Sequence, residues 1–208
     1  MKIKGLLPGY EMGKKFVERH NFQGETALDI GAGHCGHTIA FAEKFNHVDA
    51  IDINDIRYQP SELLKISPHA KKIRFIKMDA HDINKLKPYD LVYSLSAMEH
   101  MSDLKDILNK LPAITQKQFY LVISPLFYSP LGHHLDPEIG EWEHLILPEE
   151  ELKARFFANG GASCRWQIYK ELNKVTAAEL IEIAKNNFKI TFLKVDITTI
   201  EMLCEKQP

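Results

Sequence analysis

Three glycines directly after an apolar segment are the first residues whose types and spacing could do chemistry. Gly31, Gly33 and Gly36 follow the pattern G-x-G-x-x-G, between a predicted strand at 26–30 and a helical pattern. Glycine lets the chain turn tightly and lets a ligand approach the backbone. The backbone N–H groups at the start of the helix favour an anionic group. The loop therefore predicts a nucleoside-containing ligand, and the glycines alone fit a dinucleotide as well as other ligands of this class.

Aspartates lie at or just after the ends of the first three predicted strands. Asp52 ends the second strand, where a carboxylate suits the hydroxyls of a ribose, and Asp79 follows the third, where a carboxylate can accept a hydrogen bond from an adenine amino group. Asp29 lies two residues before Gly31, where a carboxylate would repel a pyrophosphate and attract an ammonium group. Together the three acids predict a ligand with a cationic amino-acid end, a ribose and an adenine, which are the parts of S-adenosylmethionine.

Alternating strands and helices must position these residues. The repeated strand–helix units predict an α/β fold of the Rossmann-like, doubly wound type, with a mostly parallel sheet and helices on both faces. A capping box at Thr176 and Glu179 predicts a helix that ends near Lys185. The other predicted helices are 10–20, 37–45 and 102–111, the last with Ser102 as N-cap, and the predicted strands are 26–30, 47–53, 73–78, 89–94, 119–124 and 188–195, with 197–203 as the candidate for an antiparallel seventh.

Residues 125–175 interrupt this alternation after the fifth strand. A plain loop of about fifty residues is uncommon in a compact domain, so we expect a lid or an acceptor-binding insertion. Pro148 followed by three glutamates predicts a helix start, and Gly160 and Gly161 predict its end. The length of 208 residues predicts a single domain over 1–208 that contains this insertion.

Charge, hydropathy and cysteine content exclude several classes of protein. The formal net charge of −2 provides no basic field, so nucleic acid is not expected as a partner. No run approaches ~18 apolar residues and the first residues lack an apolar signal core, so we expect neither a membrane span nor a signal peptide. The three cysteines are widely spaced and predict no disulfide framework, which makes a cytoplasmic location the default.

Five motifs, taken as a set, resemble the class I S-adenosylmethionine-dependent methyltransferases, especially the small members that act on metabolites. ALDIGAGHCGHT is similar to the first motif of that family, VDAIDIN to the second, and IKMDAHDI to the adenine motif. YDLVYSLSAMEHM resembles the fourth-strand motif, and LNKVTAAELIEIAKNNFKITFLKV resembles the last helix and the sixth strand. The resemblance covers residues 10–125 and 172–195, and it implies S-adenosylmethionine as the cofactor and S-adenosylhomocysteine as its product.

The resemblance implies roles for residues around the amino-acid end and the ribose of the cofactor. Asp29 would contact the methionine amino group, and Gly31 and Gly33 would let the methionine part pass close to the backbone. Asp52 would hold the ribose hydroxyls. The glycines of the family often run G-x-G-x-G, whereas Cys35 occupies the position of the third glycine in this chain.

The resemblance also implies roles around the adenine and the transferable methyl group. Ile53 would pack on the adenine face, while Asp79 and Ala80 would hold the adenine edge. Ser94 and Leu95 would line the floor of the site near the methyl group.

Histidines are the candidates for acid–base chemistry at the acceptor. The sulfonium methyl group is already activated, so positioning contributes most, and a general base adds about 10²–10⁴-fold. His100 follows the fourth strand, where the family often shows Glu-His, and His133, His134 and His144 lie in the insertion. We expect His100 and one of the other three to act as base or to anchor the acceptor. With Asp136 the insertion histidines could also hold a metal, but their spacing matches no standard zinc pattern, so no metal is expected.

These features predict an enzyme that transfers a methyl group from S-adenosylmethionine to an oxygen, and less readily to a nitrogen, of a small-molecule acceptor. Two alternatives stay open. The glycines and Asp52 also fit an NAD-dependent oxidoreductase, although Asp29 speaks against it, and a non-catalytic module that only binds S-adenosylmethionine would show the same motifs. The sequence indicates neither the acceptor nor the oligomeric state.

Overall fold

A single sheet organises the chain in the computed structural model, which describes residues 8–55, 65 and 67–207. Within these residues seven strands follow the order β3-β2-β1-β4-β5-β7-β6. β1 to β5 run parallel, and β7 runs antiparallel to both of its neighbours. The predicted Rossmann-like, mostly parallel sheet is therefore confirmed. The strands are β1 (Gly24–Ile30), β2 (Phe45–Asp52), β3 (Ile73–Lys77), β4 (Tyr89–Leu95), β5 (Thr115–Ile123), β6 (Phe188–Val195) and β7 (Ile200–Lys206).

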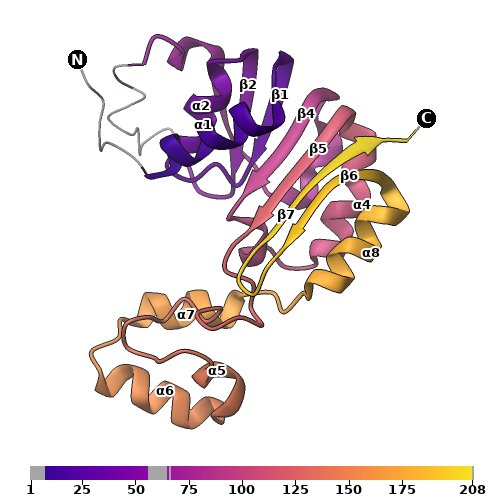
Figure 1. Cartoon of the computed structure of the whole chain (residues 1–208). Coiled ribbons are helices and arrows are strands. Elements are labelled where there is room, and N and C mark those ends of the chain that lie inside the picture. The colour runs from indigo at the N-terminus through magenta and orange to yellow at the C-terminus, as the bar shows by residue number, and fades with distance from the viewer. Residues whose placement is uncertain (1–7, 56–64, 66, 208) are drawn as a thin grey trace.

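Helices cover both faces of this sheet (Figure 1). On one face lie α1 (Pro8–His20) and α2 (Gly36–Ala42), whose apolar side chains pack in one core cluster with the inner strands. On the other face lie α4 (Leu104–Ile114) and α8 (Ala177–Asn187), which contribute to a second cluster. The predicted arrangement of helices on both faces is confirmed, and it buries each of the central strands from both sides.

The boundaries of two helices differ from their predicted positions. The helix expected over 37–45 ends at Ala42, because the Lys44 N–H donates to the Phe41 carbonyl and Phe45 already begins β2. The rings of Phe41 and Phe45 still stack, with centroids 6.5 Å apart, which explains the helical spacing in the sequence. The N-cap of α4 is Asp103 rather than Ser102.

The C-terminal elements follow the prediction closely. The capping box at Thr176 is present, with both hydrogen bonds to Glu179 formed. The antiparallel strand β7 begins at Ile200, three residues later than predicted, because residues 196–199 form the turn that connects it to β6. This turn can be tight because the Asp196 side chain accepts backbone N–H groups of Thr198 and Thr199 at 2.9 and 2.8 Å.

The insertion over 125–175 forms a helical unit with an apolar core of its own. It contains α5 (Glu143–Ile146), α6 (Glu149–Ala158) and α7 (Ser163–Glu171), and the predicted start and end of α6 are confirmed. In Figure 1 this orange unit lies beyond the carboxyl ends of the parallel strands and apart from the sheet. Its role as a lid stays a prediction. The core consists of Phe127, Leu135, Ile139, Leu152, Phe156, Trp166, Tyr169 and Leu172.

Two further observations concern the chain as a whole. In the described part of the chain no helix combines the length and the apolar character needed to cross a membrane. Cys35, Cys164 and Cys204 are free cysteines, two of them buried and Cys164 exposed.

Candidate active site

The glycine loop connects β1 to α2 at the point where the strand order reverses. Gly31 and Gly33 adopt positive φ angles of 78° and 49°. A Cβ atom on Gly31 would lie 2.4 Å from the Cβ of Ala97, so both the backbone conformation and the space require glycine. Cys35 also has a positive φ, and its buried side chain packs with Ala50, so the departure from the family pattern keeps a left-handed loop.

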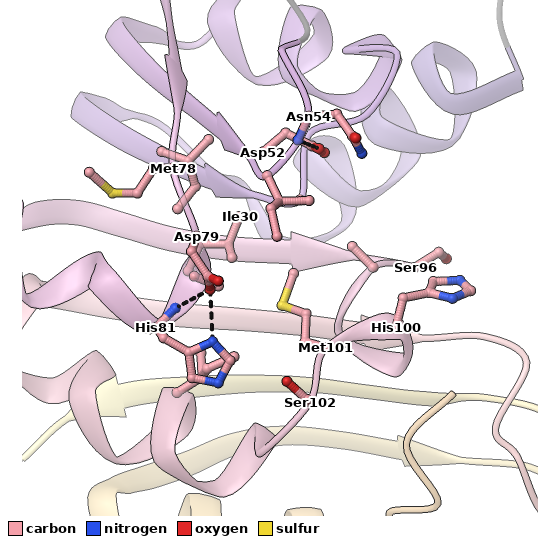
Figure 2. Close-up of a pocket in the computed structure, with 16 residues that line it drawn as sticks. Ile30, Asp52, Asn54, Met78, Asp79, His81, Ser96, His100, Met101 and Ser102 are labelled. Atoms are coloured by element: carbon pink, nitrogen blue, oxygen red, sulfur yellow. Dashed lines mark hydrogen bonds and ion pairs between the residues drawn. The ribbon is translucent and has the colours of Figure 1, made fainter. Parts of the chain in front are cut away.

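A cavity of about 290 Å³ opens beside this loop, outside the carboxyl ends of β1, β2, β3 and β4. This is the place where ligands bind in open α/β sheets. The cavity brings together residues that are far apart in the sequence, and Figure 2 shows Ser96 and His100 on the side away from Asp79 and His81. Of the predicted site residues, the cavity is lined by Gly31, Asp52, Ile53, Asp79, Ala80 and His100.

Both carboxylates of the cavity are held by backbone N–H groups. Asp52 accepts from Gly33 at 3.0 Å with one oxygen and from Asn54 at 2.9 Å with the other. Asp79 accepts from the His81 N–H at 2.9 Å, and its carboxylate lies 2.7 Å from the His81 ring (Figure 2). These bonds, the backbone one first, lower the pKa of Asp79. No lysine or arginine of the described residues lines the cavity, so it suits a cationic ligand better than a pyrophosphate.

Four other predicted cofactor residues lie behind this lining. Asp29 is buried and accepts a hydrogen bond from the Thr38 hydroxyl at 2.6 Å, and burial raises its pKa to about 7. Ser94 donates to the Ile30 carbonyl at 2.8 Å, and Leu95 packs in the core on the side of α1 and α2. Gly33 contributes its N–H to Asp52. These residues shape the ends of β1 and β4, and their predicted contacts with a cofactor stay predictions.

Two of the four candidate histidines meet at the edge of the cavity. His100 belongs to the short 3-10 helix η4 (Met98–His100) after β4. Its ring contacts that of His134 edge to face, with centroids 5.0 Å apart. Burial is the main cause that lowers the pKa of His134 to about 4, and the nearby charge of His100 adds to this effect. A backbone hydrogen bond to Pro125 acts in the opposite direction and raises this pKa. Nε2 of His134 is buried and has no hydrogen-bond partner.

The other two histidines lie inside the insertion. The Leu135 N–H donates to Nδ1 of His133 at 2.8 Å, so Nε2 of the neutral ring carries the proton. Nε2 of His144 lies 2.8 Å from the Phe127 carbonyl and must donate to it. Neither residue lines the cavity, and a protonated Nε2 on His133 is no metal ligand. In the part of the chain that the structure describes, no group of three candidate ligands is arranged for a metal.

The segment after β4 contributes lining residues that the sequence analysis did not single out. Ser96, Ala97, Met101 and Ser102 line the cavity. They follow β4 directly, and all except Ser102 lie within the fourth-strand motif YDLVYSLSAMEHM, which gave the signal for this segment. Glu99 of the same segment is buried without a hydrogen-bond partner, and burial raises its pKa to about 8.

Asn173, at the end of the insertion, holds this segment in place. Its side-chain amide donates to the carbonyls of Met98 and Met101 at 2.6 and 3.0 Å, and its backbone N–H donates to the Glu99 carbonyl at 2.9 Å. No local pattern could predict these contacts, because they join residues more than seventy positions apart.

Comparison with known proteins agrees with this geometry. The model of a family described as a methyltransferase domain matches residues 27–118, which include the glycine loop, Asp52, Asp79 and His100. A curated relative, (S)-tetrahydroprotoberberine N-methyltransferase of Eschscholzia californica, is 24% identical over 118 residues. The match spans 54% of this chain and 33% of that protein.

Solved structures share the fold across nearly the whole chain. Magnesium protoporphyrin IX methyltransferase from Synechocystis PCC 6803, with bound S-adenosylhomocysteine, superimposes with a TM-score of 0.64 at 15% identity, covering 96% of this chain and 81% of that one. A putative S-adenosylmethionine-dependent methyltransferase from Listeria monocytogenes also has a TM-score of 0.64, at 17% identity, covering 95% and 100%. The motifs, the matched methyltransferase-domain model and the fold together support a class I S-adenosylmethionine-dependent methyltransferase.

Proposed function

We propose that this protein transfers the methyl group of S-adenosylmethionine to an oxygen of a small-molecule acceptor. The observation that carries the proposal is the contact between His100, which lines the cavity with Asp52 and Asp79, and His134, whose Nε2 has no hydrogen-bond partner. A half-buried neutral imidazole at the edge of a cofactor cavity suits the removal of a proton from a hydroxyl group.

The cavity residues have distinct tasks in this proposal. Asp52 and Asp79 hold the ribose and adenine, with their carboxylates oriented in advance by backbone N–H groups. Gly31 leaves room for the amino-acid end next to Ala97. Asp29, behind the loop, supports the ammonium group through its charge. S-adenosylmethionine supplies a methyl group on a positively charged sulfur, and Ser96 and Met101 line the cavity beside His100.

His134 then takes the proton of the acceptor. The hydroxyl oxygen uses one electron pair for the new bond to carbon, and its proton passes to Nε2 of His134. The imidazolium is formed beside the Asp136 carboxylate, whose charge favours the protonated ring. His100, on the cofactor side of the pair, orients the acceptor. A base of this kind adds about 10²–10⁴-fold to a reaction that positioning already makes possible.

A nitrogen acceptor is the second candidate. The curated relative is by its name an N-methyltransferase. An amine acceptor would transfer its proton to Nε2 of His134, as proposed for the hydroxyl. We expect the oxygen acceptor because a hydroxyl is the weaker nucleophile and gains more from a buried base.

The test combines donor binding with turnover. Calorimetry with S-adenosylhomocysteine and with NAD⁺ should show binding of the first alone. The protein is then incubated with S-adenosylmethionine labelled in its methyl group and pools of small hydroxyl compounds and amines, and the products are identified by mass. Binding of NAD⁺ alone contradicts the proposal, and binding of S-adenosylhomocysteine without transfer to any pool indicates a non-catalytic module. The predicted cytoplasmic location is a separate prediction.

A further inference from the structure

A second cavity, of about 540 Å³ and widely open to solvent, lies where β5 passes into the insertion. It adjoins the first through the histidine pair, since His134 lines the second cavity and contacts His100, which lines the first. The turn between β6 and β7 closes another side, where the Thr198 carbonyl accepts the Leu126 N–H at 2.8 Å. The lining residues are Ser124, Pro125, Leu131, His134, Asp136 and Thr198.

The polar atoms of this second cavity mainly accept hydrogen bonds. Nε2 of His134 has no hydrogen-bond partner among the described residues. The Asp136 carboxylate makes no hydrogen bond or ion pair with the described residues, although its charge acts on the neighbouring His133 and His134. The Thr198 hydroxyl donates its proton to an Asp196 oxygen at 3.0 Å, and its own oxygen lies 3.2 Å from the Thr199 hydroxyl, from which it can accept. An occupant must therefore bring donors.

The nearby cations are already engaged and do not line the second cavity. Arg165 forms an ion pair with Glu138 at 2.6 Å, and its guanidinium also donates to the carbonyls of His134 and Asp136. Lys194 lies 3.9 Å from Asp196, beyond the turn. No lysine or arginine of the described residues lines this cavity, so Asp136 gives it a negative charge.

We propose that the second cavity is the acceptor seat and that it selects hydroxyl compounds that carry a protonated amine. The ammonium group faces Asp136 and the hydroxyl faces Nε2 of His134, while Pro125 and Leu131 contact the carbon skeleton between them. This inference rests on the proposed methyl transfer and adds the chemical class of the acceptor. An acceptor with a carboxylate or phosphate in place of the amine would be repelled.

Three matched phenols test the inference on the full chain loaded with S-adenosylhomocysteine. Tyramine carries an ammonium group, 4-ethylphenol carries no charge and 4-hydroxyphenylacetate carries a carboxylate. Calorimetry should show the tightest binding for tyramine and the weakest for 4-hydroxyphenylacetate, with about a fivefold step expected for one partly exposed ion pair. Added salt should weaken the binding of tyramine and leave that of 4-ethylphenol unchanged.

Two variants test whether Asp136 causes the preference for the ammonium compound. Asp136→Asn should lower the affinity for tyramine by about fivefold and leave that for 4-ethylphenol unchanged. Glu182→Gln, which removes the same charge from the exposed side of α8, should change neither. Equal binding of the three phenols, binding of none at millimolar concentration, or an equal loss for all three in Asp136→Asn overturns the inference. A protein that fails to bind S-adenosylhomocysteine overturns the proposed function instead.

Discussion

The rings of His100 and His134 meet edge to face, with centroids 5.0 Å apart, although one follows β4 and the other lies in the insertion. Each ring lines a different cavity, so the pair marks the place where the two cavities adjoin. In the proposed mechanism the insertion thus brings a base to the end of the sheet, where the ends of the parallel strands gather the residues proposed to bind the donor.

The protonation state of His134 gives a prediction for the pH profile. Its pKa is lowered to about 4, so the ring is neutral, and active as a base, above that pH and loses activity as the pH falls through 4. With the donor at saturating concentration, kcat/KM for the acceptor in the wild-type protein should thus show no inflection near pH 6.5, where an unperturbed histidine titrates. His134→Asn should lower kcat by about 10²–10⁴-fold with donor affinity unchanged. His69→Asn, at a histidine that lines neither cavity, is the control.

Alanine substitutions of three glycines should distinguish the effect of a steric clash from the effect of a positive φ angle. Gly31→Ala combines a positive φ with a clash at Ala97, so it should abolish measurable binding of S-adenosylhomocysteine. Gly33→Ala meets no atom within 4 Å and should weaken the protein only by the left-handed conformation, about 1–2 kcal/mol. Gly140→Ala, where the nearest atom is a flexible glutamate side chain at 3.4 Å, is the matched control. Equal donor affinity in all three variants would contradict a donor site beside Gly31.

Asp52 has a double task that two substitutions can resolve. Its oxygens hold the N–H groups of Gly33 and Asn54, so Asp52→Ala removes both the loop contacts and the proposed ribose contact. We expect a loss of at least about tenfold in affinity for S-adenosylhomocysteine, the equivalent of one hydrogen bond to a charged group. Asp52→Asn keeps one carbonyl oxygen and should lose less. Unchanged affinity in both variants, measured by calorimetry, would remove Asp52 from the site.

Asp29 should make donor binding depend on pH. Burial raises its pKa to about 7, so the carboxyl is neutral below this pH and charged above it. Affinity for S-adenosylhomocysteine, whose ammonium the carboxylate attracts, should rise between pH 6 and 8. Asp29→Asn keeps a hydrogen-bonding group beside Thr38 but removes the charge, so its affinity should stay flat over the same range. A rise that persists in this variant would assign the effect to another group.

Glu99 should make folding stability fall with rising pH. Burial raises its folded-state pKa from 4.5 to about 8, so between these values the folded state binds the proton more tightly than the unfolded chain. This contribution is fully present below pH 4.5 and is lost as the pH rises through about 8. Between pH 7 and 8 the free energy of unfolding should drop by about 1 kcal/mol. Chemical denaturation of Glu99→Gln should lack that drop, and an identical slope would show that Glu99 does not titrate there.

Local signals in the sequence predicted the sheet, the cofactor loop and the capping box, because each depends on residues close together in the chain. The glycines, Asp52 and Asp79 each follow a strand, and the carboxyl ends of parallel strands meet at one edge. The boundaries of elements were predicted less accurately where tertiary packing determines them. Phe45 has helical spacing but begins β2, and Asp103 caps α4 in place of Ser102.

The histidines show what a single sequence could not resolve. All four candidates have the same side chain, and three share one segment, so residue type and position did not rank them. The Leu135 N–H on His133 and the Phe127 carbonyl on His144 orient these two rings within the insertion. Among these three histidines, only His134 lines one of the two cavities described above. The hydrogen bond from the Asn173 side chain to η4 holds the insertion close to His100.

The separate core of the insertion divides the chain into two parts that can change independently. Phe127, Leu152 and Trp166 pack among themselves and not with the clusters on either face of the sheet. Substitutions at distant sites without shared partners add their free energies, so repacking this unit leaves the sheet's stability nearly untouched. Evolution, or an engineer, can therefore change the core of the insertion, which we propose to meet the acceptor, with little effect on the donor cavity, provided that the hydrogen bonds of Asn173 to the segment after β4 are kept.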